Sequence, residues 1–169
     1  MKEFNTTGLC NPNKHYMVDI SNKLDDIKKL VEKEKYFIIN RPRQYGKTTI
    51  LLALENNLKD EYLVISISFE GTDINSFSTP KNFCNLFVEL VSESLDYIDE
   101  KLGGLFVSFS KDINSLTNLS RAISRFIKEI NKEVILIIDE VDKSSDNQMF
   151  LFDYNSSILS TYINILSEY

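Results

Sequence analysis

The residues most informative about chemistry are Gly46, Lys47, Thr48 and Thr49, which stand between an apolar run and an expected helix. A loop in this position turns successive backbone N–H groups toward one point, and the helix N-terminus adds partial positive charge. Such a loop binds the β- and γ-phosphates of a nucleotide, with the lysine ammonium on the phosphates and the first threonine hydroxyl on Mg²⁺. The expected nucleotide-binding residues are Arg43, Gln44, Tyr45, Gly46, Lys47, Thr48 and Thr49.

The loop departs from the usual phosphate-loop pattern at its first position. The pattern has a glycine five residues before Gly46, and this chain has Arg41 there. Pro42 stiffens the turn, and Arg41 and Arg43 can add positive charge toward a phosphate. The alternative interpretation is an ordinary strand-to-helix turn with a surface lysine.

A second group of functional residues, Asp139 and Glu140, follows the apolar run Val134–Ile138. A strand buried on both faces fixes the point at which these carboxylates emerge. We expect Asp139 to hold Mg²⁺, through water, and Glu140 to orient and deprotonate the attacking water. The alternative is that two acidic residues simply begin a solvated loop. Because the phosphate loop and the acidic strand end occur in the expected order, nucleotide binding is the favoured interpretation.

The residues around the acidic strand end favour ATP over GTP. GTPases usually have glycine three positions after the Mg²⁺ aspartate, and this chain has Asp142. The segment Asn22–Asp25 matches a guanine-reading pattern, but it precedes the phosphate loop and lies in an expected helix, so we interpret it as coincidence. A glutamate directly after the Mg²⁺ aspartate is typical of ATPases.

Weaker candidates lie elsewhere in the chain. Arg121 and Arg125 stand one helical turn apart and could reach a neighbouring subunit's γ-phosphate, although solvated surface charges are the more common case. Glu70, after the second expected strand, could enter the nucleotide site or cap the next turn. His15 has no nucleophilic partner pattern. The two cysteines, Cys10 and Cys84, lack metal-ligand spacing and are expected to be reduced thiols.

The elements that must position these residues alternate between strand and helix. Apolar runs predict strands, and helical spacing of apolar residues predicts helices, one of them ending at Gly103 and Gly104. This alternation predicts an α/β, three-layer phosphate-loop NTPase fold with a mostly parallel sheet. The expected helices are 21–31, 47–58, 80–102 and 116–130, and the expected strands are 36–39, 63–69 and 134–138.

Composition limits the class of protein. The chain has 169 residues, of which 43% are hydrophobic and 26% charged, and its net charge is −6. These values predict one globular domain rather than a disordered chain. The acidic balance does not indicate nucleic acid or an anionic membrane as a partner. The longest aliphatic run is too short to span a bilayer, and the N-terminus has no apolar signal region, so we expect a cytoplasmic protein.

At its motifs the chain resembles the AAA-ATPase-like family of bacterial proteins, which are phosphate-loop ATPases with a catalytic glutamate after the acidic strand. The resemblance covers about residues 4–151 and is carried by the blocks Asn13–Asp19, Ile39–Thr49, Ser68–Gly71 and Ile138–Ser144. It implies that Arg41 in place of glycine is a family trait. It also implies ATP binding and possible hydrolysis, with Lys47, Thr48, Asp139 and Glu140 in the roles given above. Members often continue into a domain similar to PD-(D/E)XK nucleases.

The resemblance fades after Leu151. ATPases of this class carry two more strands, the first of which bears a polar sensor residue and lies between the loop strand and the acidic strand. We expect the chain to lack these last strands and to be a truncated family member, with a loose helix over Ile158–Leu166. The expected domains are an irregular segment 1–20, a nucleotide-binding domain 21–151 and a divergent tail 152–169.

Three functions remain open at this point. The first is an ATPase that hydrolyses Mg-ATP slowly, the second a non-catalytic nucleotide-dependent switch or interaction module, and the third an inactive truncated product. A homo-oligomer or a protein partner is possible in each case.

Overall fold

The computed structural model describes residues 19–33, 37–40, 46–140 and 163–168, together with Glu3, Asn13, Lys14 and Tyr16. Helices and strands alternate along these residues, with a short 3₁₀ helix, η1, before the third α-helix. In chain order the elements are α1 (Ser21–Glu32), β1 (Phe37–Asn40), α2 (Lys47–Leu58), β2 (Leu63–Ser68), η1 (Ile74–Phe77), α3 (Pro80–Ile98), α4 (Glu100–Phe109), α5 (Leu116–Ile130), β3 (Val134–Asp139) and β4 (Ile163–Glu168).

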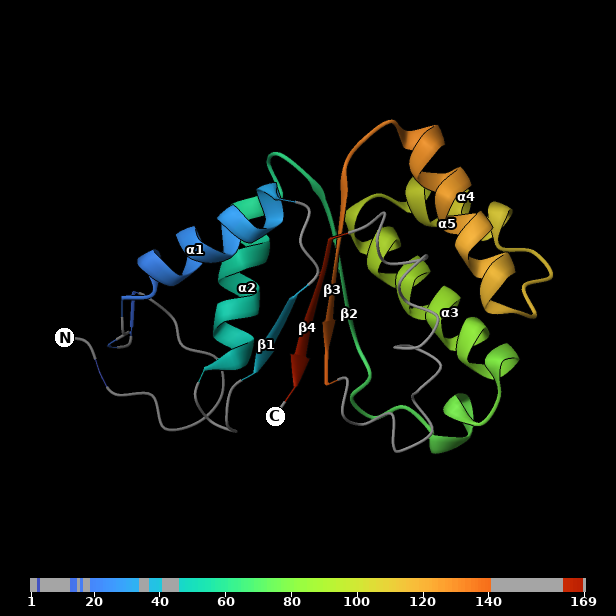
Figure 1. The fold of residues 1–169 in the computed structure, drawn as a ribbon, viewed down its shortest axis with the longest axis horizontal. Helices are drawn as coiled ribbons and strands as arrows, with labels where there is room; N and C mark the ends of the chain where they lie inside the picture. Colours follow the sequence, from blue (N-terminus) through green and yellow to red (C-terminus); the bar gives the residue numbers. More distant parts are fainter. Residues whose placement is uncertain are drawn as a thin grey trace.

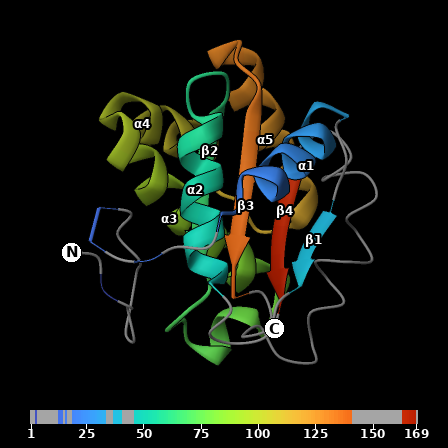
Figure 2. The same cartoon turned by 90° about the vertical axis from the view of Figure 1, so that its left-hand side faces the viewer.

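The strands form a four-stranded sheet in the order β1-β4-β3-β2, and each neighbouring pair is parallel. Helices α1 and α2 cover one face of the sheet, and α3, α4 and α5 cover the other (Figure 1). The view from the side of α1 and α2 shows β3, β4 and β1 side by side, with α2 in front of β2 (Figure 2). The expected three-layer α/β fold with a parallel sheet is therefore confirmed.

Strand β4 corrects the expectation for the end of the chain. A loose helix over Ile158–Leu166 is wrong for the described part, because Ile163–Glu168 is a strand. It lies between the loop strand and the acidic strand, with Ile165 paired to Phe37 on one side and to Ile137 on the other. The strand that the sequence led us to consider missing from the middle of the sheet is thus present. It satisfies backbone groups of β1 and β3 that would otherwise face a gap.

The two faces of β3 contribute to two separate hydrophobic cores. Ile135 and Ile137 pack with α1 and α2, whereas Leu136 and Ile138 pack with α3, α4 and α5. All four side chains are buried. An apolar run without polar alternation is what a strand covered on both faces requires, and this burial fixes the position of the residues that follow it.

The break between α3 and α4 differs from the sequence expectation. A single helix ending at Gly103 and Gly104 was predicted, but α3 ends at Ile98 and both glycines lie inside α4. Asp99 takes an extended conformation with φ −160°, and its side chain accepts a hydrogen bond from the Lys101 N–H at 2.9 Å. This cap starts a new helix, so the apolar spacing continues while the helix axis does not.

None of the helices in the described ranges has both the length and the apolar character needed to cross a membrane.

Candidate functional site at the carboxyl edge of the sheet

The first component of the site is the start of α2. Gly46 precedes the helix with φ +73°, in the left-handed region that glycine adopts without a steric penalty. Its carbonyl oxygen accepts the first helical hydrogen bond, from the Ile50 N–H at 3.0 Å. Lys47 is the first residue of α2, so its side chain starts from a helix end that carries partial positive charge and orphan N–H groups.

The second component is the end of β3. The Phe69 N–H donates to the Asp139 carbonyl oxygen at 3.1 Å, so pairing with the β2 side extends to the last residue of β3. Glu140 then turns into the left-handed region with φ +56°, which is uncommon for a residue with a side chain. Its N–H donates to the Asp139 Oδ1 at 2.8 Å, and this bond joins the two acidic residues in one turn.

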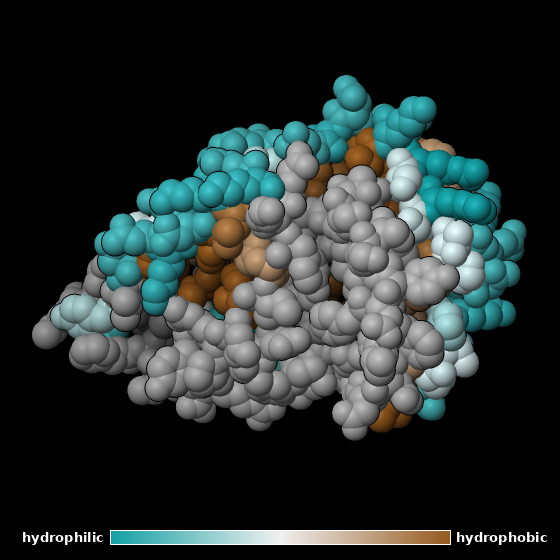
Figure 3. All heavy atoms as spheres, viewed as in Figure 1, coloured by the Kyte–Doolittle hydropathy of each residue, from teal (hydrophilic) through white to brown (hydrophobic). Residues whose placement is uncertain are grey.

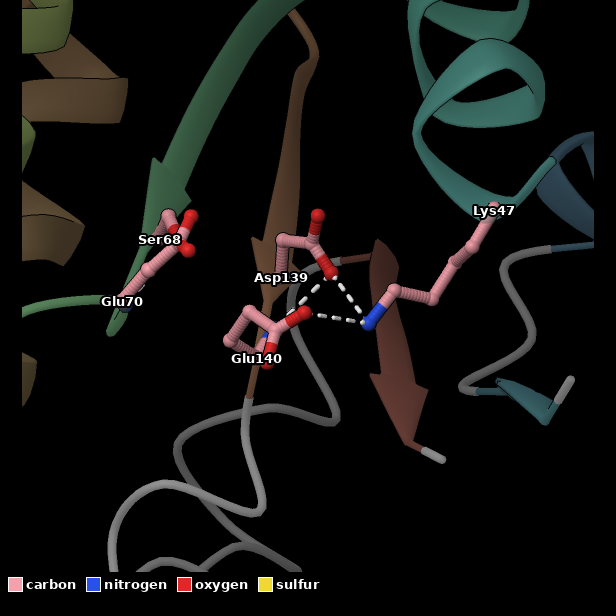
Figure 4. A network of polar contacts seen from close by, with 5 residues as sticks. All are labelled: Lys47, Ser68, Glu70, Asp139 and Glu140. Carbon is pink, nitrogen blue, oxygen red and sulfur yellow. Dashed lines mark hydrogen bonds and ion pairs between the residues drawn. The ribbon is translucent and has the colours of Figure 1, made fainter. Parts of the chain in front are cut away.

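Lys47 brings the two components together (Figure 4). Its Nζ lies 2.9 Å from Asp139 Oδ1 and 3.0 Å from Glu140 Oε1. The three side chains are 13%, 19% and 21% exposed, respectively, so these ion pairs are partly shielded from water. Partial burial strengthens the attraction between opposite charges relative to an exposed pair.

The pKa of Lys47 reflects two opposing effects. Burial disfavours the charged ammonium and lowers the pKa, but the hydrogen bonds to Asp139 and Glu140 outweigh burial and raise the pKa above its ordinary value. Lys47 therefore stays positively charged through neutral pH. A permanent cation at the start of a helix, next to two carboxylates at a strand end, is a suitable environment for phosphate and a divalent cation.

Two other expected site residues lie in the first turn of α2, and several more lie outside the described ranges. Thr48 and Thr49 occupy the first turn of α2, where Thr48 is exposed and Thr49 half-buried. Six predicted or candidate residues lie outside the described residues: Cys10, His15, Arg41, Arg43, Gln44 and Tyr45. Cys84 is buried on α3, and burial raises the pKa of its thiol to about 11, which makes it a poor nucleophile.

Glu70 stands at the same edge of the sheet as the site but on the β2 side. Its N–H donates to the Ser68 Oγ at 3.1 Å, and its side chain is exposed. Figure 4 shows Glu70 and Ser68 on the opposite side of Asp139 and Glu140 from Lys47.

Arg121 and Arg125 lie on α5, in the helical layer that covers the face opposite α2, so this chain does not bring them to its own Lys47.

The sequence interpretation missed the polar end of β4. Leu166 pairs with Ile138, so Ser167 and Glu168 follow at the same edge, in register with Ile39 and Asn40 of β1. The local signal was weak, because Asn164 interrupts the apolar residues and only Ile165 and Leu166 stand together before Ser167 and Glu168. These two positions lie on the strand between β1 and β3.

The donor groups at this edge fit a magnesium-bound nucleotide. The ammonium of Lys47 and the N-terminus of α2 suit phosphate oxygens. The carboxylate of Asp139 is the kind of oxygen ligand that Mg²⁺ prefers, and Mg²⁺ commonly takes one or two carboxylates and substrate phosphates. The fit rests on the 2.9 Å contact that places the Lys47 cation beside Asp139.

Comparison with known proteins agrees with this arrangement. No curated protein matches the chain. A protein-family model described as an AAA-like domain matches residues 9–162, which is most of the chain and includes both the expected phosphate loop and the acidic end of β3. A nucleotide-binding, ATPase-type function is what this family suggests. The chain belongs to the AAA-like domain family.

Proposed function

We propose that this chain binds Mg-ATP at the carboxyl edge of its sheet and hydrolyses it slowly. The observation that carries the proposal is the position of Lys47 Nζ, within 3.0 Å of both Asp139 and Glu140. The start of α2 supplies the cation, and the end of β3, distant in sequence, supplies the carboxylates. Phosphoryl transfer uses both kinds of group. Strand β4, which pairs with both β1 and β3, forms part of this domain.

The proposed phosphate-binding group consists of the α2 N-terminus and the loop before it. Gly46 allows the backbone to turn into the helix, and Lys47 supplies the full positive charge. Because the pKa of Lys47 is raised, its charge persists at neutral pH and needs no bound phosphate to stabilise it. The remaining proposed nucleotide-binding residues are Arg43, Gln44, Tyr45, Thr48 and Thr49.

The proposed metal-binding residues are Asp139 and Thr48, the former through water. When bound there, Mg²⁺ would supply positive charge that offsets the negative charge developing on the phosphates. The hydrogen bond from the Glu140 N–H to Asp139 Oδ1 fixes the carboxylate at the end of β3, and pairing with β2 fixes the backbone beneath it.

Glu140 is the proposed general base. Its left-handed backbone turns the side chain back toward Lys47 instead of continuing along the strand, so its carboxylate lies at the site. A carboxylate in this position can accept a proton from a water molecule that attacks the terminal phosphate. Phosphate binding by Lys47 would release Glu140 from its ion pair and allow it to act on water.

One observation favours the alternative of a non-catalytic nucleotide-dependent switch. Glu140 is bound by Lys47 at 3.0 Å, and this ion pair occupies a carboxylate oxygen that would otherwise be available to water. If Glu140 keeps this ion pair when nucleotide is bound, the chain would bind ATP without turning it over. An inactive truncated product is less well supported, because β4 completes the pairing between β1 and β3.

Two measurements on the same preparation distinguish these functions. We expect Mg-ATP to raise the melting temperature of the chain more than Mg-GTP does, and we expect phosphate release above the level of a protein-free control. Stabilisation without phosphate release would support the switch instead. Absence of stabilisation by Mg-ATP at millimolar concentration would contradict nucleotide binding altogether.

A further inference from the structure

An open groove of about 290 Å³ lies between η1 and the first half of α3. On the η1 side its lining residues are Asp73, Asn75 and Ser76. On α3 they are Asn82, Asn85, Leu86 and Glu89. Positions 82, 85, 86 and 89 fall on one face of a helix, so α3 forms a continuous wall. Ligand pockets usually measure about 300–1,000 Å³, and this groove therefore suits one long side chain better than a whole cofactor.

The groove has carboxylates but no cation among its described lining residues. Asp73 stands on the η1 side and Glu89 on α3, and no salt bridge of the described residues includes either of them. The stretch 73–100 contains six aspartate or glutamate residues and one lysine, Lys81, which is exposed and is not among the described lining residues. The groove therefore attracts positively charged groups and repels anions.

The hydrogen bonds around the groove use donors and leave acceptors. Asn82 Nδ2 donates to the Asn75 carbonyl oxygen at 3.0 Å and to Ser78 Oγ at 3.2 Å, which leaves the amide oxygen of Asn82 as an acceptor. Asp73 Oδ1 accepts from the Asn75 N–H at 2.8 Å, which leaves Oδ2. Within the part of the chain that the structure describes, the Glu89 carboxylate accepts no hydrogen bond. A ligand that fits the groove must supply N–H donors.

We infer that this groove binds an arginine side chain of a partner polypeptide. A guanidinium group carries five N–H donors, no acceptor and a permanent positive charge, which complements carboxylate and amide oxygens. Its alkyl stem can lie on Leu86, the apolar residue of the described lining. Lysine also carries a positive charge, but its compact ammonium reaches fewer acceptors at once than the planar guanidinium fork does.

The surface next to the groove favours a polypeptide over a free small amine. Ile74 stands between Asp73 and Asn75 in the chain and is 66% exposed. Figure 3 shows hydrophobic surface beside hydrophilic residues at the lower right, where η1 lies below α3 in Figure 1. A residue that flanks the bound arginine can cover Ile74, whereas a free amine leaves it in water. The groove shares no residue with the proposed ATP site, so the inference does not depend on nucleotide binding.

The test titrates two peptides into the full chain and follows its backbone amides by NMR. The first is an acetylated and amidated peptide of glycine, leucine, arginine, leucine and glycine. The second has citrulline, which keeps the shape of arginine without its charge. Glu89→Gln and Asp73→Asn remove the carboxylate charges with little change in shape, and asparagine is also a good helix cap. Glu93→Gln is the matched control, because Glu93 is exposed on α3 one turn beyond Glu89 and is not among the described lining residues.

We expect the arginine peptide to shift the amide resonances of η1 and the first half of α3. It should bind at least about tenfold more tightly than the citrulline peptide, because hydrogen bonds from a charged donor are the stronger ones. The double variant Asp73→Asn with Glu89→Gln should bind the arginine peptide at least about tenfold more weakly than the parent does, whereas Glu93→Gln should bind as the parent does. Circular dichroism checks the fold, and the two single variants give the same comparison if the double variant unfolds.

Several results would overturn the inference. They are equal binding of the two peptides, resonance shifts confined to another surface, and variants of Asp73 and Glu89 that bind as tightly as the parent. Acetylated and amidated arginine, without flanking residues, tests whether the occupant is a polypeptide. We expect it to bind more weakly than the peptide, and we expect Ile74→Ser to weaken binding of the peptide alone. Equal affinities of the two probes, unchanged in Ile74→Ser, would assign the groove to a free guanidine compound and contradict a polypeptide partner.

Discussion

Lys47 and Glu140 stand 93 residues apart in the sequence, and Lys47 Nζ lies 3.0 Å from Glu140 Oε1. The contact joins the start of α2 to the residue after β3, which are the two places where the sequence predicts chemistry. The parallel sheet causes this meeting. In a parallel α/β sheet, loops that follow the strands gather at one edge, and ligands bind there.

Replacement of Glu140 by glutamine tests its proposed role as the base. Glutamine keeps the shape of the side chain but does not accept a proton from water, so we expect turnover to fall by about 10²–10⁴-fold while Mg-ATP still binds. Glu70→Gln is the matched control, because Glu70 lies at the same edge of the sheet on the far side from Lys47. Steady-state phosphate release measures both variants. Equal turnover in Glu140→Gln and the parent would show that Glu140 is not the base.

Replacement of Asp139 by asparagine should affect the metal-dependent part of binding. Titration calorimetry with ATP, once with Mg²⁺ and once with a chelator, gives the gain in affinity that the metal supplies. We expect the parent to show this gain and Asp139→Asn to lose most of it, because a neutral amide is a poorer Mg²⁺ ligand than a carboxylate. Asp60→Asn, an exposed residue just beyond α2, should behave as the parent. A gain of the same size in Asp139→Asn would remove Asp139 from the metal site.

Because β4 lies between β1 and β3, disrupting β4 should weaken both of these strands. Ile165→Pro removes a backbone N–H from a strand that has neighbours on both sides, so we expect a loss of at least about 3 kcal/mol in the free energy of unfolding. Hydrogen exchange should show faster exchange in β1 and β3. Ile74→Pro is the control, since Ile74 is the exposed first residue of η1, where proline is tolerated. Unchanged protection of β1 and β3 in Ile165→Pro would place β4 outside the sheet.

Two adjacent glycines of α4 should respond differently to alanine. A Cβ on Gly103 would contact the Asp96 side chain and come within 3.0 Å of the Ser92 carbonyl oxygen on α3, whereas a Cβ on Gly104 would meet nothing within 4 Å. The Asp96 side chain can rotate away, but the backbone oxygen of Ser92 cannot. We expect Gly104→Ala to stabilise the chain by roughly 0.5–1 kcal/mol through helix propensity. Gly103→Ala should be less stable than Gly104→Ala by at least about 1 kcal/mol.

Urea denaturation of both alanine variants measures this difference. Equal free energies of unfolding would mean that α3 and α4 do not approach each other closely at Gly103.

The sequence was a good guide to elements whose local pattern decides their structure. The run before Asp139 is apolar at every position, which only a strand covered on both faces requires, and β3 is buried accordingly. The order of glycine, lysine and threonine at positions 46–48 predicted the start of α2 because a phosphate-type loop must end at a helix N-terminus. These two local patterns were enough to identify the pair of segments that meet at the site.

Other features depend on contacts between distant segments, which a local pattern does not reveal. Residues 163–168 contain asparagine, serine and glutamate among their apolar residues, so their strand character comes from β1 and β3 on either side. At Asp99 the apolar spacing continues without interruption, and only the extended backbone of one residue separates α3 from α4. The left-handed turn at Glu140 likewise had no sequence signal, because glutamate seldom adopts it.

The most direct test of the account is calorimetric titration of Mg-ATP into the parent chain and into Lys47→Ala. Lys59→Ala is the matched control, because Lys59 follows the other end of the same helix, where its Nζ donates a hydrogen bond to the Asn56 side chain at 3.0 Å. A charge-assisted hydrogen bond contributes about 1.5–3 kcal/mol, so Lys47→Ala should bind at least about tenfold more weakly. Lys59→Ala should bind as the parent does. Equal affinity of Lys47→Ala and the parent would contradict a phosphate site at the start of α2.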